Sequence, residues 1–306
     1  MFKFFKIKKE ERLQANEPQY KKAWVTHMLS ELIGSIWISL GLAGLSIIIQ
    51  NKPLEVYLLH NVIVGFFAGF IIVGSCLFIF GRWSVDLNPV VTLYRWLNGT
   101  NTTRYAFIKI FFQLIGGIIA GLIIYGIGHF TSDLNFANFY ISPANSSNKD
   151  FIVSNNISNP YKMDLNGTIN QLMPGTFWIL FVELVISMIL LFPIFSPRID
   201  NKYRDLFIML IISFDVWMGI LAGSAAINPI RGLAQQVPTL FFDMNKMSHF
   251  KQQDILLGTL AMIIGDLLAP FVYALFQGWT EKYFNNWILK AINFKNHKID
   301  DYVKNK

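Results

Sequence analysis

The chain has 306 residues, of which 53% are hydrophobic and 15% charged, and its formal net charge is +7. Its mean hydropathy is positive, which excludes an ordinary water-soluble domain and predicts an integral membrane protein. The single cysteine, Cys76, excludes an intramolecular disulfide, and we expect no metal site and no cofactor. Basic residues gather at the two ends, which predicts contact with a cytoplasmic membrane surface and no binding of nucleic acid.

The first part of the chain predicts a basic tail followed by three membrane spans. Residues 1–23 should form a cytoplasmic tail. Spans are expected at 24–49, at 57–80 and in a third segment that ends near Gly128. Glu31 stands out as a carboxylate in the first span. We interpret it as a buried acceptor for the backbone N–H groups of a re-entrant loop; the alternative is snorkelling to an interface.

The second part predicts a long loop, three more spans and a second basic tail. Residues 129–173 are rich in Asn, Ser and Thr and should lie outside the cell. The spans are expected at 174–195, which carries Glu183 as the counterpart of Glu31, at 206–222 and at 255–277. Residues 279–306 should return to the cytoplasm. The chain thus divides into a first repeat at about 24–128, the loop, and a second repeat at about 174–278.

Two Asn-Pro pairs interrupt apolar regions at corresponding places in the two repeats. Asn88-Pro89 follows the second span, and Asn228-Pro229 follows the fifth. Asn caps free backbone N–H groups and Pro is well tolerated at the first helical position, so each pair predicts the start of a short helix. The second short helix should end before Pro238. Paired breaks of this kind are typical of an inverted repeat whose half-helices meet at the bilayer midplane.

With Arg231 two residues after Pro229, and with Glu31 and Glu183, these pairs resemble the aquaporin and aquaglyceroporin family of major intrinsic proteins. The resemblance covers about residues 24–278. It implies an all-α membrane protein with six transmembrane helices and two re-entrant half-helices. It also implies a homotetramer with one pore per subunit, in the cell membrane, with both termini in the cytoplasm.

The arrangement predicts a passive channel for small neutral solutes. Two half-helices place their positive dipole ends at the bilayer centre, where they repel cations and protons. The side-chain amides of Asn88 and Asn228 can donate hydrogen bonds to a passing solute. By resemblance, Arg231 is the filter arginine; an intramembrane guanidinium needs water and acceptors around it.

The resemblance also indicates which residues set the width of the filter. Without gaps, the family's filter positions fall on Ala68, Val216 and Ala225. These small apolar residues favour a wide filter for glycerol-like polyols, with urea or water as further solutes. If the loop before Asn228 holds one extra residue, the positions become Asp215 and Ser224, and a carboxylate would lie opposite Arg231.

Several residues depart from the family pattern. Val90 and Ile230 stand where Ala usually follows Asn-Pro, so overpacking could push the half-helices apart or constrict the lumen. Asp86 stands where the first loop usually has His. Gly232 stands where glycerol-conducting members have Asp, which weakens the glycerol hypothesis.

Two other functions stay open at this stage. One is an ion-coupled secondary transporter of similar architecture, with Asp215, Asp266, Glu31 or Glu183 as coupling sites. The other is a non-conducting member that serves as a scaffold. No nucleophile, metal or phosphate motif stands out, so we expect no catalytic residues and no enzymatic activity.

Overall fold

The structure is a computed structural model that describes most of the expected helical core. It describes residues 15–43, 59, 62–130, 175–196, 199–222, 224–241, 252–280, 283, 287, 290 and 291. The predicted outer loop lies outside these residues from 131 onward, and so do residues 1–14 and most of the second tail.

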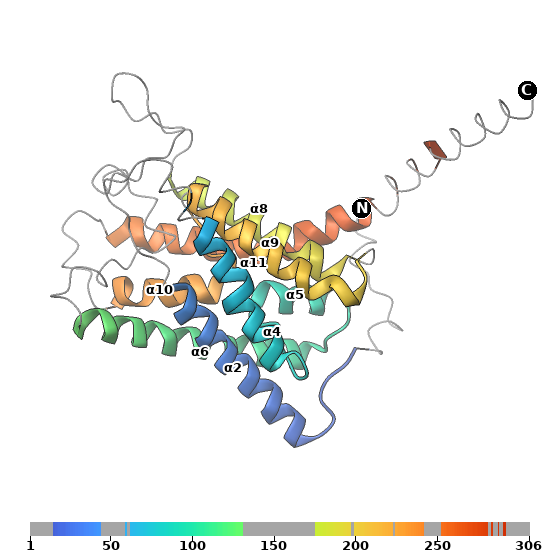
Figure 1. Ribbon diagram of the computed structural model, residues 1–306, viewed down its shortest axis with the longest axis horizontal. Helices are drawn as coiled ribbons and strands as arrows, with labels where there is room; N and C mark the ends of the chain where they lie inside the picture. Colours follow the sequence, from blue (N-terminus) through green and yellow to red (C-terminus); the bar gives the residue numbers. More distant parts are fainter. Residues whose placement is uncertain are drawn as a thin grey trace, which may run out of the picture.

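Long helices dominate the described part of the chain, and no strand occurs in it. They are α2 (Lys21–Ala43), the π-helical segment η2 (Phe67–Val73) that continues into α4 (Gly74–Phe80), α6 (Thr103–Phe130), α8 (Gly175–Phe195), α9 (Asn201–Ala222) and α11 (Gln252–Trp279). Two shorter helices, α5 (Pro89–Leu97) and α10 (Pro229–Phe241), run toward opposite ends of the molecule between α6 and α11 (Figure 1).

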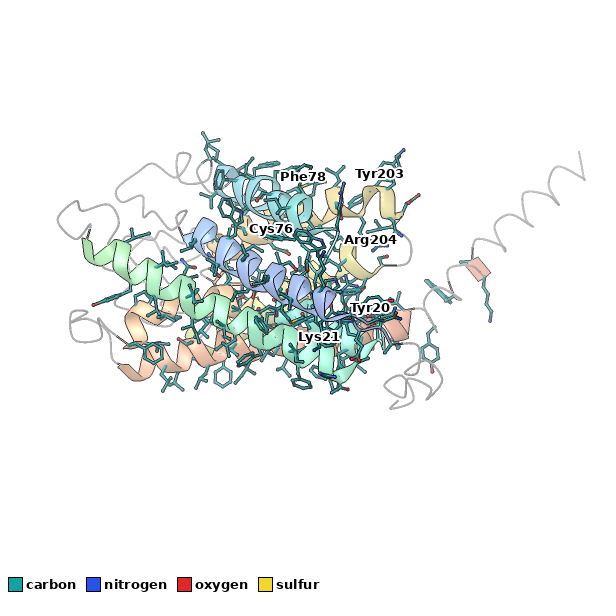
Figure 2. The ribbon with its side chains drawn as sticks, turned by 90° about the horizontal axis from the view of Figure 1, so that it is seen from below. Tyr20, Lys21, Cys76, Phe78, Tyr203 and Arg204 are labelled. Atoms are coloured by element: carbon teal, nitrogen blue, oxygen red, sulfur yellow. The ribbon has the colours of Figure 1, made fainter. Side chains whose placement is uncertain are left out.

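The long helices have the length and surface of membrane spans. Five of them are long and apolar enough to cross a bilayer; α9, the remaining expected span, has 22 residues but is not among the five. Large apolar side chains point outward; Phe78, for example, is 90% exposed, whereas Cys76 on the same helix is buried (Figure 2). A helix satisfies its own backbone hydrogen bonds, so helices with apolar outer surfaces suit a lipid environment.

The first helix begins at Lys21 rather than at Trp24, the predicted start of the span. The residues before it are tied to the end of the first half-helix region. The Asn16 amide donates to the Thr100 carbonyl at 2.9 Å, and the Thr102 hydroxyl donates to the Glu17 carboxylate at 2.7 Å. The described end of the first tail is therefore part of the folded structure.

The prediction that the second half-helix ends before Pro238 is wrong, because α10 continues through this proline to Phe241. A proline inside a helix costs roughly 3 kcal/mol. The continuation is nevertheless well packed: Gln236 and Val237 are buried, and a Cβ on Gly121 of α6 would lie 2.8 Å from the Ala234 carbonyl oxygen. Burial against α6 thus stabilises a turn that local propensity disfavours.

Candidate functional site

The candidate site lies where the N-termini of α5 and α10 meet. Asn88 caps α5: its Oδ1 accepts a hydrogen bond from the Val90 amide at 2.9 Å, and Pro89 is the first helical residue. Asn228 does the same for α10, with the Ile230 amide at 3.0 Å. The Asn-Pro pairs therefore start two half-helices by the same capping geometry.

Each capping asparagine also reaches across to the other half-helix. Asn88 Nδ2 donates to the Ile227 carbonyl at 2.9 Å, and Asn228 Nδ2 donates to the Leu87 carbonyl at 2.7 Å. Leu87 and Ile227 have positive φ angles of 51° and 60°, a strained conformation for such side chains. These φ angles direct both carbonyls toward the opposite repeat, and the two hydrogen bonds hold the N-termini of α5 and α10 together.

Glu31 holds the loop that precedes α5. Its side chain is fully buried, and its oxygens accept hydrogen bonds from the Ser84 hydroxyl at 2.5 Å, the Asp86 amide at 3.0 Å and the Leu87 amide at 2.7 Å. A buried carboxylate with three donors braces the backbone, whereas a snorkelled one would reach solvent. The structure places Glu31 in the bracing arrangement.

Glu183 holds the loop that precedes α10 in the same way. It is fully buried and accepts hydrogen bonds from the Ser224 hydroxyl and from the amides of Ala226 and Ile227, both at 2.8 Å. The serine and the two amides correspond to the donors of Glu31. The inverted repeat thus extends from the helices to individual hydrogen bonds.

The first repeat adds a buried cation that sequence reasoning missed. The ammonium of Lys109, on α6, is 3.4 Å from a Glu31 oxygen and pairs with Asp86. Asp86 also binds Arg95 Nε at 2.8 Å. Lys109 is only 2% exposed, although its position near a helix end suggested a cytoplasmic flank. Asp86 in place of a histidine was the available signal, because a buried carboxylate needs a cation.

Gln113 is the second residue that the sequence reasoning did not assign. It lies one helical turn after Lys109 on α6, and its Nε2 donates to Glu31 at 2.7 Å and to Thr92 Oγ1 at 3.1 Å. Its spacing of four residues from Lys109 puts both side chains on one face of the helix. That face supplies a cation and a neutral donor to the first loop.

In the second repeat a serine and an aspartate occupy the corresponding region. Ser187, on α8, has its hydroxyl oxygen 3.1 Å from the Ile227 carbonyl and 2.5 Å from Asp266 Oδ1. Asp266, on α11, is fully buried and interacts with Glu183. Neither carboxylate has an ion pair within 4.0 Å among the described residues.

Comparisons with known proteins agree with this geometry. Residues 18–273 match the family described as "Major intrinsic protein". The chain belongs to the major intrinsic protein family. Its fold is similar to the X-ray structure of the aquaglyceroporin from Plasmodium falciparum, with a TM-score of 0.51 and 16% sequence identity over 85% of this chain and 97% of that chain. A comparison with curated proteins found no match.

Membership confirms the predicted fold: an all-α, multi-pass membrane protein with six long helices and two half-helices in an inverted repeat. Members of the major intrinsic protein family are channels for small solutes. Among the described residues, no three His, Cys, Asp or Glu side chains come together as a metal site would require.

Arg231 sits one turn into the second half-helix of this major intrinsic protein. It is 7% exposed, and its Nη1 donates to the Ala225 carbonyl at 2.6 Å, while its Nε is buried without a hydrogen-bond partner. Asp215 is buried on α9 with one unpaired carboxylate oxygen. The two residues form no ion pair in the described structure, so Asp215 does not neutralise Arg231 by direct contact.

The other proposed filter residues lie close to the two loops. Ala68 and Val216 are 0% and 5% exposed and belong to one apolar cluster that also contains Leu87 and Ile227. The Ser224 hydroxyl donates its hydrogen to Glu183, whereas Arg231 binds the carbonyl of the next residue, Ala225.

The large residues after the two Asn-Pro pairs both pack against the opposite repeat. A Cβ on Gly117 of α6 would lie 2.4 Å from Ile230 Cγ2, so the absence of a side chain there makes room for Ile230. Val90 is fully buried in a cluster with Leu191 and Ala269. The hydrogen bonds from Asn88 to the Ile227 carbonyl and from Asn228 to the Leu87 carbonyl are both formed, so the extra methyl groups do not push the half-helices apart.

Gly232, which replaces an expected aspartate, is a tightly packed position. A Cβ added there would lie 2.4 Å from Met262 Sδ and 2.8 Å from Ala226 Cβ. An aspartate would have to displace Met262, which is fully buried on α11. The second half-helix therefore packs closely against α11 at this point and leaves no room for a charged side chain.

Proposed function

We propose that this chain is a passive channel for small neutral solutes, with Asn88, Pro89, Asn228 and Pro229 at the centre of its pore. The observation that carries the proposal is the pair of cross-bonds at the meeting point of the half-helices, where each asparagine donates to the carbonyl that precedes the other asparagine. Each amide group has two hydrogens, and the cross-bond uses one of them. The other is available to a solute oxygen, next to two positive helix ends that repel cations.

Arg231 serves as the filter arginine of this channel. Ala225 supports the guanidinium through its carbonyl, and the N–H groups of the guanidinium other than the buried Nε donate to solute oxygens. Ala68 and Val216, which pack in one cluster with Leu87 and Ile227, and Ala225 are the small or medium apolar residues proposed beside the guanidinium. This combination supports glycerol-like polyols as solutes, with urea and water as further candidates. The fold similarity to a protein named as an aquaglyceroporin supports the same solute class.

Glu31 and Glu183 have a bracing role in this channel and do not touch the solute. Each fixes the backbone of one loop through three hydrogen bonds, so the carbonyls ahead of the asparagines keep a defined direction. Preorganised acceptors replace a solute's hydration partners with little reorganisation. Transport then needs only a concentration gradient.

The channel is expected to work as a homotetramer in the cell membrane, with both termini in the cytoplasm. Lys21 at the start of α2 and Arg204 at the start of α9 lie at the same end of the molecule (Figure 2). Basic residues gathered at one membrane face support a cytoplasmic location for that end.

Stopped-flow light scattering on reconstituted vesicles tests the proposal. Osmotic gradients of glycerol, urea, a larger polyol and an impermeant solute measure each solute and water in turn. The wild type should pass glycerol faster than empty vesicles, and Arg231→Ala should change the ranking of solutes. Arg82→Ala is the control because Arg82 is exposed on the surface, outside the site.

Two outcomes would contradict the proposal. If the wild type passes none of the solutes faster than empty vesicles, the protein is not a channel for them. If the flux saturates and disappears when an uncoupler removes the proton gradient, the protein is an ion-coupled transporter instead.

A further inference from the structure

A buried carboxyl group in the second repeat has no role in the channel described above. Asp266 is fully buried on α11, and no ion pair within 4.0 Å neutralises it in the described structure. An isolated charge at membrane depth is strongly unfavourable. Its surroundings therefore have to stabilise it in another way.

The two contacts of the Ser187 hydroxyl indicate how Asp266 is stabilised. The Ser187 oxygen is 3.1 Å from the Ile227 carbonyl and 2.5 Å from Asp266 Oδ1. A hydroxyl has one hydrogen, and a carbonyl can only accept. If the Ser187 hydrogen serves Ile227, the short contact to Asp266 needs a hydrogen from the carboxyl group. A protonated Asp266 satisfies both contacts.

The neighbouring acid supports the same conclusion. Asp266 interacts with Glu183, which is also fully buried. Two adjacent buried carboxylates repel each other, which disfavours two negative charges. A proton on Asp266 removes one of these charges.

We propose that Asp266 is a proton-binding site, and that its proton acts as a latch on the second half-helix. The latch runs from Asp266 through Ser187 to the Ile227 carbonyl, which also accepts the hydrogen bond of Asn88. Loss of the proton redirects the Ser187 hydrogen toward the new carboxylate. The Ile227 carbonyl then keeps only Asn88 as a donor, and the added charge repels Glu183, which holds the same loop.

The charged groups around Asp266 are few. The helices packed against α11 are α8, α10 and α5, and they contribute Glu183, Arg231 and Arg95 respectively as their only charged side chains. Arg95 binds Asp86 in the first repeat. Neither Arg231 nor Arg95 forms an ion pair with Asp266 in the described structure.

The inference rests on the proposed channel for its functional readout, so glycerol flux is measured in proteoliposomes from neutral to alkaline pH. The wild type should lose flux about fivefold at alkaline pH, the change expected for loss of one net hydrogen bond. Asp266→Asn carries a permanent neutral donor and should keep its flux throughout. Asp205→Asn, at an exposed position on α9, should retain the wild-type pH response.

A second measurement reports the proton itself without any flux. Infrared spectroscopy of the purified wild type should show the carbonyl stretch of a neutral carboxyl group that is missing from Asp266→Asn. Asp215→Asn is the matched control, because Asp215 is also buried but forms no hydrogen bond with Ser187 in the described structure; it should leave the Asp266 signal unchanged.

Three results would overturn the proposal. The first is a carboxyl carbonyl band that is unchanged between the wild type and Asp266→Asn, and the second is a wild-type glycerol flux that does not depend on pH. The third is a glycerol flux driven by a pH gradient alone, because the proton would then be a coupling ion. A wild type without flux at any pH contradicts the channel instead, and the infrared comparison then still decides whether Asp266 holds the proton.

Discussion

In each repeat a buried glutamate accepts hydrogen bonds from the loop before the half-helix. The two repeats differ in the groups that surround the charge of this glutamate. Glu31 lies beside Lys109 and accepts a hydrogen bond from Gln113. Glu183 lies beside Asp266, with no cation within 4.0 Å among the described residues. The first repeat therefore buries an ion-pair network, and the second buries a pair of acids. The backbone geometry of both loops is nevertheless alike, so one loop structure tolerates two electrostatic solutions.

Among the variants considered, substitution of Lys109 should lower the stability of the protein most. Lys109→Met leaves Glu31 and Asp86 buried without their shared ammonium, and loss of one partner of a buried ion pair typically costs about 3–5 kcal/mol. Asp86→Asn in the same chain removes one of the stranded charges and should recover part of the loss. The midpoint of thermal unfolding in detergent measures both. Equal midpoints for wild type and Lys109→Met would show that the network contributes no stability.

Substitution of the two asparagines tests the helix cap and cross-bond that both repeats share. Asn88→Ala and Asn228→Ala each remove a helix cap, worth about 0.5–2 kcal/mol, and one cross-bond, worth roughly 1 kcal/mol. We expect similar losses from both variants, together with a loss of glycerol flux. Because each asparagine bonds to the residue that precedes the other, the double variant should be less destabilised than the sum of the single ones. Strict additivity would contradict the reciprocal lock.

Substitution of Gly117 tests the packing of the first repeat against the second. Gly117→Ala brings a methyl group into the space of Ile230, so overpacking should cost about 1–3 kcal/mol. Ile230→Ala in the same chain removes the contact with Cγ2 and should restore part of the stability, because the carbonyl oxygen of residue 230 stays 2.9 Å from the added Cβ. Gly126→Ala is a control, because no atom lies within 4 Å of a Cβ added there. If both glycine variants lose the same stability, helix packing at Gly117 is not the cause.

The sequence predicts the shared features of the repeats better than their differences. Asn-Pro carries its own local mechanism, a cap followed by a preset backbone angle, so α5 and α10 begin where predicted. The buried position of Lys109 was not predicted, because a lysine near a helix end usually faces the cytoplasm. Its partners come from two other segments, and only the tertiary structure brings them together. The extension of α10 through Pro238 is likewise decided by burial against α6 and not by local propensity.

The smallest expected effect distinguishes the two cations within the first repeat. Arg95 binds the same aspartate as Lys109, with Nε 2.8 Å from Asp86 Oδ1, but its side chain is 37% exposed. Water can replace much of this interaction, so Arg95→Met should cost at most about 1 kcal/mol. Asp86 keeps Lys109 and the Thr92 hydroxyl in the variant. High salt should weaken the contribution of Arg95 and leave that of Lys109 almost unchanged, because buried pairs are screened less. If thermal unfolding shows the opposite order, with Arg95→Met worse than Lys109→Met, burial does not decide which cation holds the first loop.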